Sequence, residues 1–114
     1  MNLEAFELII LRRPSGPRSY DEDTAARIQR EHLAFYDQLR AAGSVATNGP
    51  VLDQPDKSLR GLAFYRTGSL AEGRKLAEQD PAVLAGLLEV EVMTWWYPPH
   101  TLALSGRAIT VPDS

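Results

Sequence analysis

The sequence predicts an α+β fold in which a four-stranded antiparallel sheet carries two helices on one face. Three observations predict it: four short apolar runs of strand length, two longer segments with the spacing of amphipathic helices, and their order along the chain. That order is strand, helix, strand, strand, helix, strand, which two split βαβ units placed side by side would give. The expected architecture is therefore the ferredoxin-like βαββαβ arrangement.

The first strand and the first helix are strongly marked. Residues 3–12 contain the continuous apolar run "FELIIL", and a loop rich in Pro, Gly and Ser follows them. The helix is expected over about residues 21–42. Ser19 and Glu22 have the spacing of a capping box, and acidic residues crowd the first turn, where the helix dipole favours them. Gly43 is a typical residue for ending a helix.

The middle of the chain supplies two strands and the second helix. Residues 44–51, "SVATNGPV", and residues 59–67, "LRGLAFYRT", are expected to be strands, and the turn-rich segment "LDQPDKS" separates them. Ser69 and Glu72 have the capping spacing again, so the helix "LAEGRKLAEQ" is expected over residues 70–79.

The end of the chain adds a helical turn, the fourth strand and an extension. Asp80 is expected to cap the turn or short helix in "DPAVLAG", with Pro81 at its first helical position. Residues 87–97 are the fourth strand, which completes a domain over residues 1–97. Residues 98–114 extend beyond it. Their alternation in "LALS" and "AITV" fits either an edge strand or an arm over a second subunit.

Both faces of the predicted sheet are apolar. Phe6 and Leu8 lie on one face of the first strand and Ile9 lies on the other, while the neighbouring Trp95 and Trp96 must point to opposite faces. A two-layer fold would leave one of these faces in water, which is unusual for a monomer. We therefore expect a homodimer whose sheets pack against each other.

Composition excludes several classes of protein. The formal charge of −3 disfavours nucleic acids and anionic membrane surfaces, which bind basic faces. The absence of cysteine excludes disulfides, thiolate nucleophiles and zinc fingers. The start "MNLEAFELIILRR" has neither a basic leader nor a small-residue cleavage site, and its apolar run is too short to span a membrane. We therefore expect a cytoplasmic protein.

Motifs for RNA, metal and nucleotide binding are incomplete. The segment "RGLAFYRT" partly matches the RNA-recognition signature, but Leu62 and Thr67 replace aromatic residues that would stack on bases. The two histidines, His32 and His100, lie in distant segments without metal-ligand spacing. A glycine-rich phosphate loop is lacking, and no motif supports a haem bound through His32. We expect no metal, cofactor or nucleic acid.

One histidine stands on an apolar stripe of the first helix. The stripe has alternating spacings of four and three and consists of Ala25, Ile28, His32, Phe35, Leu39 and Ala42. One interpretation is a core histidine whose ring nitrogens bond to the backbone or to a buried water. The other interpretation is functional, and it requires a partner group at the same height in the fold.

Asp80 is such a partner in the predicted topology. The two helices run antiparallel, so the end of the first and the start of the second share one edge of the sheet. Counting about ten residues from that edge, roughly 15 Å at 1.5 Å per residue, reaches Asp80 on one side and His32 on the other. A hydrogen bond between them would give a general base with an orienting carboxylate. Asp80 can serve as helix cap at the same time.

Several segments are similar to one known family. They are the His-Leu of "EHL", the Gly-Pro of "ATNGPV", the helix "SLAEGRKLAEQDP" and the strand "AGLLEVEVMTWW", which follow in order over residues 3–97. In these segments the chain resembles the YCII-related (YciI-like) family. The resemblance implies a dimeric α+β barrel of two ferredoxin-like subunits. It also implies a histidine–aspartate active-site pair at His32 and Asp80, in a pocket lined by Gly49 and Pro50. The long first loop and the C-terminal extension depart from the family.

The resemblance leaves the reaction open. Related members are credited with eliminating chloride from chlorinated hydroquinones, and the wider barrel superfamily includes lactone isomerases and oxygenases, so no substrate is carried over. With one base and no metal motif, we expect a lyase- or isomerase-type enzyme. His32, assisted by Asp80, would abstract a proton from a small acidic substrate of aromatic or lactone type. The alternatives are a ligand-binding module without chemistry and a purely structural dimer.

Three arginines, Arg12, Arg13 and Arg18, stand where the first strand ends and the first helix begins. One interpretation is a solvated loop, since exposed arginines are common. The other is a rim that recognises an anion, because the guanidinium fork matches carboxylate or phenolate oxygens. On this second interpretation we expect Arg12 to bind substrate together with Gly49 and Pro50.

Overall fold

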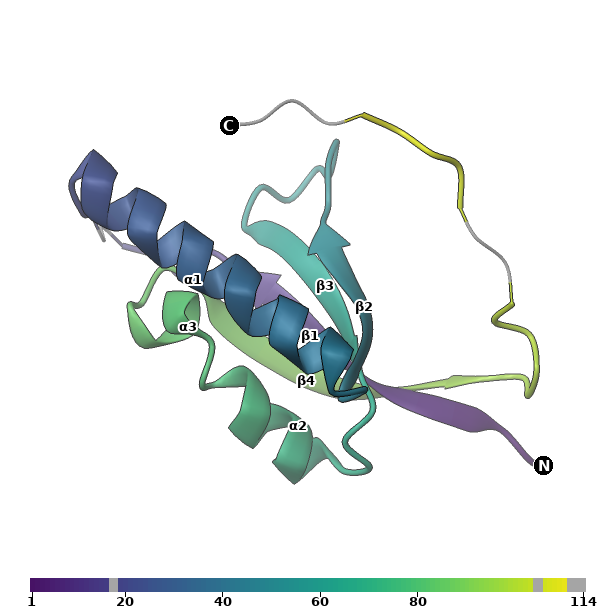
Figure 1. Cartoon of the computed structure of the whole chain (residues 1–114). Coiled ribbons are helices and arrows are strands. Elements are labelled where there is room, and N and C mark those ends of the chain that lie inside the picture. Colours follow the sequence, from purple (N-terminus) through teal and green to yellow (C-terminus); the bar gives the residue numbers. More distant parts are fainter. Residues whose placement is uncertain (17–18, 104–105, 111–114) are drawn as a thin grey trace.

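The computed structural model describes residues 1–16, 19–103 and 106–110. Its elements follow the predicted order, and the turn after the second helix is itself a short helix (Figure 1). They are β1 (Glu4–Arg12), α1 (Glu22–Ala41), β2 (Val45–Pro50), β3 (Leu59–Tyr65), α2 (Leu70–Ala77), α3 (Pro81–Leu84) and β4 (Glu89–Tyr97). The ferredoxin-like order is therefore confirmed, and each boundary lies within two residues of the expected one.

The sheet has the strand order β2-β3-β1-β4, and every neighbouring pair is antiparallel. At its centre Ile9 pairs with Ala63 on one side and with Val92 on the other. All three helices lie on one face of the sheet (Figure 1). There α1 contacts β2 and α3, while α2 contacts β1 and β4.

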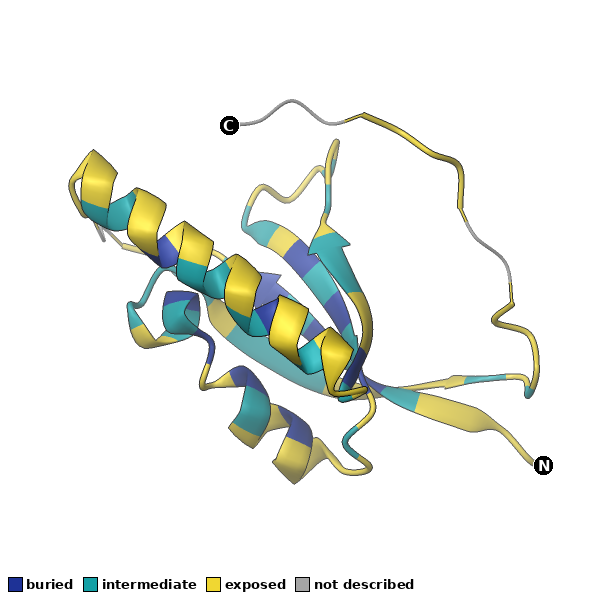
Figure 2. Ribbon diagram, in the orientation of Figure 1, coloured by how far each residue is buried: buried dark blue, intermediate teal, exposed yellow. Residues whose placement is uncertain are grey.

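The core lies between the helices and the sheet (Figure 2). Alternation along β1 places Ile9 and Leu11 in this layer and turns Leu8 to the opposite face. Tyr36 of α1 and Tyr65 of β3 are buried here, and their hydroxyl oxygens are 2.8 Å apart. Each buried hydroxyl therefore has a hydrogen-bond partner in the other.

The opposite face of the sheet is aromatic, and no helix in the described part of the chain covers it. The strand register places eight apolar side chains there, which we call the open sheet face: Phe6, Leu8, Ile10, Leu62, Phe64, Met93, Trp95 and Tyr97. Neighbouring ring centroids among its four aromatic residues are 5.3 to 6.4 Å apart. The alternation of β4 turns Trp96 to the helix side, where it is 66 % exposed.

The helix caps follow the predictions with one correction. Ser69 caps α2, since its hydroxyl accepts a hydrogen bond from the Glu72 backbone N–H at 3.1 Å. The expected Ser19–Glu22 capping box is wrong, because Asp21 is the cap of α1 and accepts from the Thr24 N–H at 2.7 Å. A carboxylate directly before the first turn satisfies that N–H and also complements the helix dipole.

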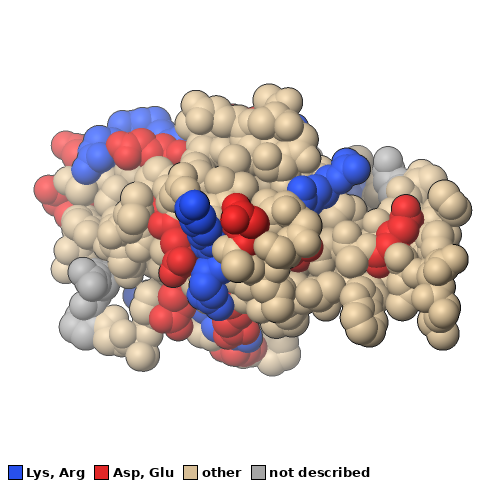
Figure 3. All heavy atoms as spheres, turned by 90° about the horizontal axis from the view of Figure 1, so that it is seen from below, with Lys and Arg blue, Asp and Glu red and all other residues tan. Residues whose placement is uncertain are grey.

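The surface carries both charges, and the described part of the C-terminal extension contains no strand. On the face that Figure 3 shows, acidic and basic side chains are interspersed, without one extended basic area. No helix in the described ranges is both long and apolar enough to cross a membrane. Residues 98–103 and 106–110 are not in a strand, and a role of the extension as an arm stays a prediction. Arg18 and parts of "LALS" and "AITV" lie outside the described residues.

The backbones of β2 and β3 approach closely at Gly61. A Cβ atom added there would lie 3.0 Å from the Gly49 carbonyl oxygen and 3.7 Å from Leu11 Cδ1. A Cβ atom at Gly49 itself would meet nothing within 4 Å. A side chain at Gly61 would therefore be crowded by the backbone of β2, whereas a side chain at Gly49 would have open space.

We expect Gly61→Ala to lower the free energy of unfolding by about 1–3 kcal/mol, because a carbonyl in a sheet cannot move away from the added methyl group. Gly49→Ala is the matched control and should change it by no more than about 0.5 kcal/mol. Urea denaturation of both variants at one protein concentration measures the difference. Equal stability of the two variants would contradict the tight contact.

Candidate active site

His32 and Asp80, far apart in the chain, are in direct contact. The Nδ1 atom of His32 is 2.8 Å from Asp80 Oδ2 and 2.9 Å from Asp80 Oδ1. The carboxylate is fully buried, whereas the His32 side chain is 13 % exposed. The imidazole therefore lies between a buried acid and the surface of the molecule. The counting of helical residues predicted that the two groups lie at one height, within reach of a hydrogen bond.

Local structure fixes both groups in place. Asp80 is the N-cap of α3, and its Oδ1 also accepts a hydrogen bond from the Ala82 backbone N–H at 2.9 Å. Pro81 at the first helical position presets the backbone for this turn. On α1 the Tyr36 ring meets the His32 ring edge-on, with centroids 5.3 Å apart. The carboxylate is thus held by backbone and the imidazole by packing.

The contact assigns the proton on the histidine ring. A carboxylate beside Nδ1 favours the tautomer in which Nδ1–H donates to Asp80, and this leaves a lone pair on Nε2. Among the described residues, none hydrogen-bonds to Nε2 of His32. In the described ranges, every side-chain nitrogen or oxygen atom that is buried has a hydrogen-bond partner. Because Nε2 of His32 has none among these residues, this atom is not buried and is open to solvent. The ring therefore presents a basic nitrogen to whatever binds beside it.

The buried tyrosine pair is close to Asp80 but is not a second base. Burial raises the pKa of Tyr65 to about 12, and the negative charge of Asp80 raises it as well. The pKa of Tyr36 is raised further, by burial first and then by its contact with Tyr65. Both hydroxyls therefore stay protonated at neutral pH.

A cavity of about 340 Å³ opens beside the His32 ring. Its walls are largely apolar and come from both helices α1 and α3, from strands β1, β2 and β3, and from the segment after α3, with Leu33 and Leu88 among them. Gly49 and Pro50 border the cavity from β2, next to the histidine, where the family resemblance implied a pocket. The volume is at the small end of ligand sites, so it suits a small molecule.

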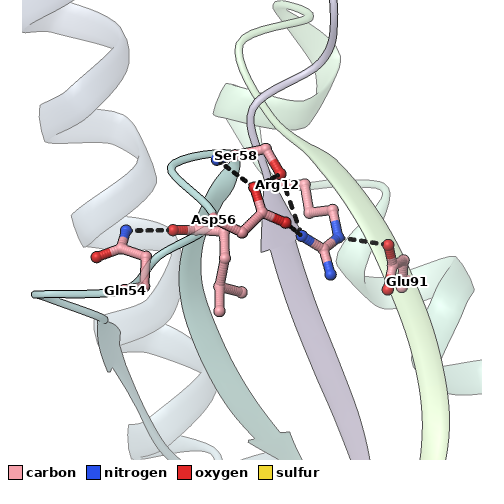
Figure 4. A network of polar contacts seen from close by, with 6 residues as sticks. Arg12, Gln54, Asp56, Ser58 and Glu91 are labelled. Carbon is pink, nitrogen blue, oxygen red and sulfur yellow. Dashed lines mark hydrogen bonds and ion pairs between the residues drawn. The ribbon is translucent and has the colours of Figure 1, made fainter.

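Arg12 does not reach this cavity. Its guanidinium donates to Glu91 Oε1 at 2.5 Å, to Asp56 Oδ2 at 3.0 Å and to Ser58 Oγ at 3.1 Å (Figure 4). The hydrogen bond with Glu91 raises the pKa of Arg12, and its charge is matched by two carboxylates. Arg12 is absent from the cavity walls, so the structure does not bring it together with Gly49 and Pro50.

Three polar residues of the cavity were not predicted: Gln29, Asn48 and Arg60. Arg60 lies at a register shift, since Leu11 pairs with Gly61 but Arg12 pairs with Leu59. It is therefore the extra residue of a bulge, a feature that redirects side chains beside functional sites. Periodicity along a strand does not reveal such a shift, although the helical spacing of Gln29 and His32 could have indicated Gln29.

The described residues offer no ready metal centre. No group of three or more His, Cys, Asp or Glu side chains within them is arranged to hold a metal ion. His32 and Asp80 bring together two such side chains, and each already bonds the other. The acidic run at the start of α1 is explained by the helix dipole.

The comparisons with known proteins agree with this architecture. A family model described as the YCII-related domain matches residues 9–96. A similar solved structure is 5-chloro-2-hydroxyhydroquinone dehydrochlorinase (TftG) from Burkholderia phenoliruptrix AC1100 in complex with 2,5-dihydroxybenzoquinone. Its TM-score is 0.57 at 22 % identity, and the match covers 81 % of this chain and 93 % of that chain. No curated protein sequence matches. Because the family model spans most of the domain, including His32 and Asp80, the chain belongs to the YCII-related domain family.

Proposed function

We propose that the protein is a small cytoplasmic enzyme in which His32 acts as general base and Asp80 orients it. The observation that carries the proposal is the 2.8 Å contact between His32 Nδ1 and the buried Asp80, beside a cavity of about 340 Å³. A purely structural histidine would not need an adjacent hollow, whereas a base needs room for a substrate. Family membership and the similar dehydrochlorinase structure support an enzyme.

The proposed step begins with a proton on the substrate. Nε2 of His32 takes this proton, and the electron pair left behind forms a new double bond. In an elimination a leaving group such as chloride departs with its own electrons, and in an isomerisation the imidazolium returns the proton to another substrate atom. Asp80 remains ionised and stabilises the imidazolium while it exists.

The cavity supports a small, planar and acidic substrate. Its apolar walls would hold an aromatic or lactone ring, and its small volume would exclude polymers. The similar solved structure is named for removing chloride from a chlorinated hydroxyhydroquinone. Chlorinated hydroxyhydroquinones and lactones are therefore the substrate classes that we propose to test first.

Replacing His32 with Gln should lower turnover by about 100-fold or more, since general base catalysis contributes about 10²–10⁴-fold. The Gln amide can still donate to Asp80, so the fold should persist. Chloride release from 5-chloro-2-hydroxyhydroquinone, and deuterium exchange into a panel of lactones, measure the effect.

His100→Gln is the matched control, because it removes the other histidine, which is exposed and outside this cavity. It should leave turnover unchanged. Turnover by His32→Gln at the wild-type rate would refute the proposed base. Ligand binding without turnover of any compound in the panel would favour a non-catalytic binding module.

Replacing Asp80 with Asn should lower kcat by about 10-fold or more and change KM little. Asn is a good helix cap and retains an oxygen for the Ala82 N–H, so α3 should keep its start. The amide can instead donate to Nδ1, which would move the ring proton to Nε2 and remove the basic lone pair. Imidazole ¹⁵N NMR should report this tautomer change. A kcat loss without any tautomer change would assign Asp80 a merely structural role.

We also propose that two chains form a homodimer through their open sheet faces, as in a dimeric α+β barrel. The face carries eight apolar side chains on three strands, and four of the eight are aromatic. Met93 and Trp95 of this face are 39 % and 37 % exposed. An apolar area of this kind is typical of interfaces between subunits. The partner that suits it best is the same face of a second copy, which a two-fold axis would supply.

Trp95→Glu should shift the protein to monomers, because it places a charge in the middle of the aromatic cluster. Trp96→Glu is the matched control, since Trp96 points to the helix side of the sheet and not to the open sheet face. Sedimentation equilibrium over a range of micromolar concentrations measures both. A monomeric wild type, or equal behaviour of the two variants, would contradict this interface.

A further inference from the structure

Two hollows meet at Arg60. The cavity of about 340 Å³ beside His32 is bordered by Arg60, Leu87 and Leu88 on one side. The same three residues border a neighbouring hollow of about 240 Å³. Its wall also includes Arg13 and the glycines Gly16 and Gly86. His32 borders the first hollow, Arg13 borders the second, and Arg60 stands in the wall of both.

Arg13 and Arg60, which border these hollows, differ in charge pairing from Arg12, Arg27 and Arg40. Arg12, Arg27 and Arg40 each form an ion pair with a carboxylate. Arg13 and Arg60 form no ion pair or side-chain hydrogen bond with any residue that the structure describes. Among the described residues, neither hollow has an Asp or Glu in its wall. In a chain of net charge −3, two guanidinium groups without a carboxylate partner among the described residues, both at the wall of the smaller hollow, favour an anion there.

We propose that Arg60 and Arg13 bind an anionic group of the substrate, which narrows the proposed aromatic or lactone substrate to one that carries a carboxylate. The guanidinium fork matches two carboxylate oxygens, and the bulge at Arg60 directs its side chain to this hollow. The ring or chain of the ligand then extends toward the Nε2 atom of His32. This inference rests on the proposed function only for the reaction, since the anion site binds with or without chemistry.

Benzoate and its neutral isostere benzamide test this site in buffer without phosphate. The chain has two histidines, so ¹H NMR resolves each imidazole separately. Benzoate should shift the His32 resonances and leave those of His100 in place. Arg60→Gln and Arg13→Gln should each weaken benzoate binding by about 10-fold and leave benzamide binding unchanged, because a charge-assisted hydrogen bond is lost.

Arg30→Gln is the matched control, since Arg30 is exposed on α1, borders neither hollow and changes the net charge equally. It should bind benzoate as the wild type does, and Arg60→Lys should recover part of the affinity. Wild-type benzoate affinity in both Arg60→Gln and Arg13→Gln, or an equal loss for benzamide, would overturn the anion site.

The anion site and the base can fail separately. Loss of benzoate binding in Arg60→Gln, with undiminished turnover in His32→Gln, would keep the anion site and refute the base. Loss of turnover in His32→Gln, with unchanged benzoate binding in both arginine variants, would keep the base and refute the anion site.

Discussion

The buried carboxylate of Asp80 is the constraint on which the site depends. An acid with no exposure to water must find donors inside the protein, and here they are the Ala82 N–H and the His32 ring. The first donor is local and comes with the start of α3. The second comes from α1, 48 residues away along the chain. Satisfying one carboxylate therefore sets the height of α1 against the segment that follows α2.

The sheet divides the molecule into two sides with different tasks. Ile9 and Leu11 of β1 face the helices and the core, and Leu11 also borders the cavity, while Phe6 and Leu8 belong to the open sheet face. The same strand therefore supports both the candidate site and the proposed dimer interface. A change on the open sheet face can reach His32 only through the packed strands between them.

The arginines show how neighbours in sequence acquire different roles. Arg12 and Arg13 are consecutive, yet the Arg12 guanidinium donates hydrogen bonds to Glu91 and Asp56. Arg13 borders the smaller hollow, whose wall includes Arg60, and Arg60 also borders the cavity beside His32. Pairing with carboxylates makes Arg12 a fixed part of the structure, and the lack of such pairing among described residues leaves Arg13 and Arg60 for a ligand.

The sequence by itself determined the order of elements, the caps at Ser69 and Asp80, and the meeting of His32 with Asp80. These follow from short-range periodicity, from capping chemistry and from one topological rule, which together placed His32 and Asp80 at one height. Only the tertiary structure decided that Asp21 caps α1, that Arg12 is neutralised by distant carboxylates, and that a bulge brings Arg60 to the cavity. Strand register and ion pairing join residues far apart in the chain, and no local pattern encodes them.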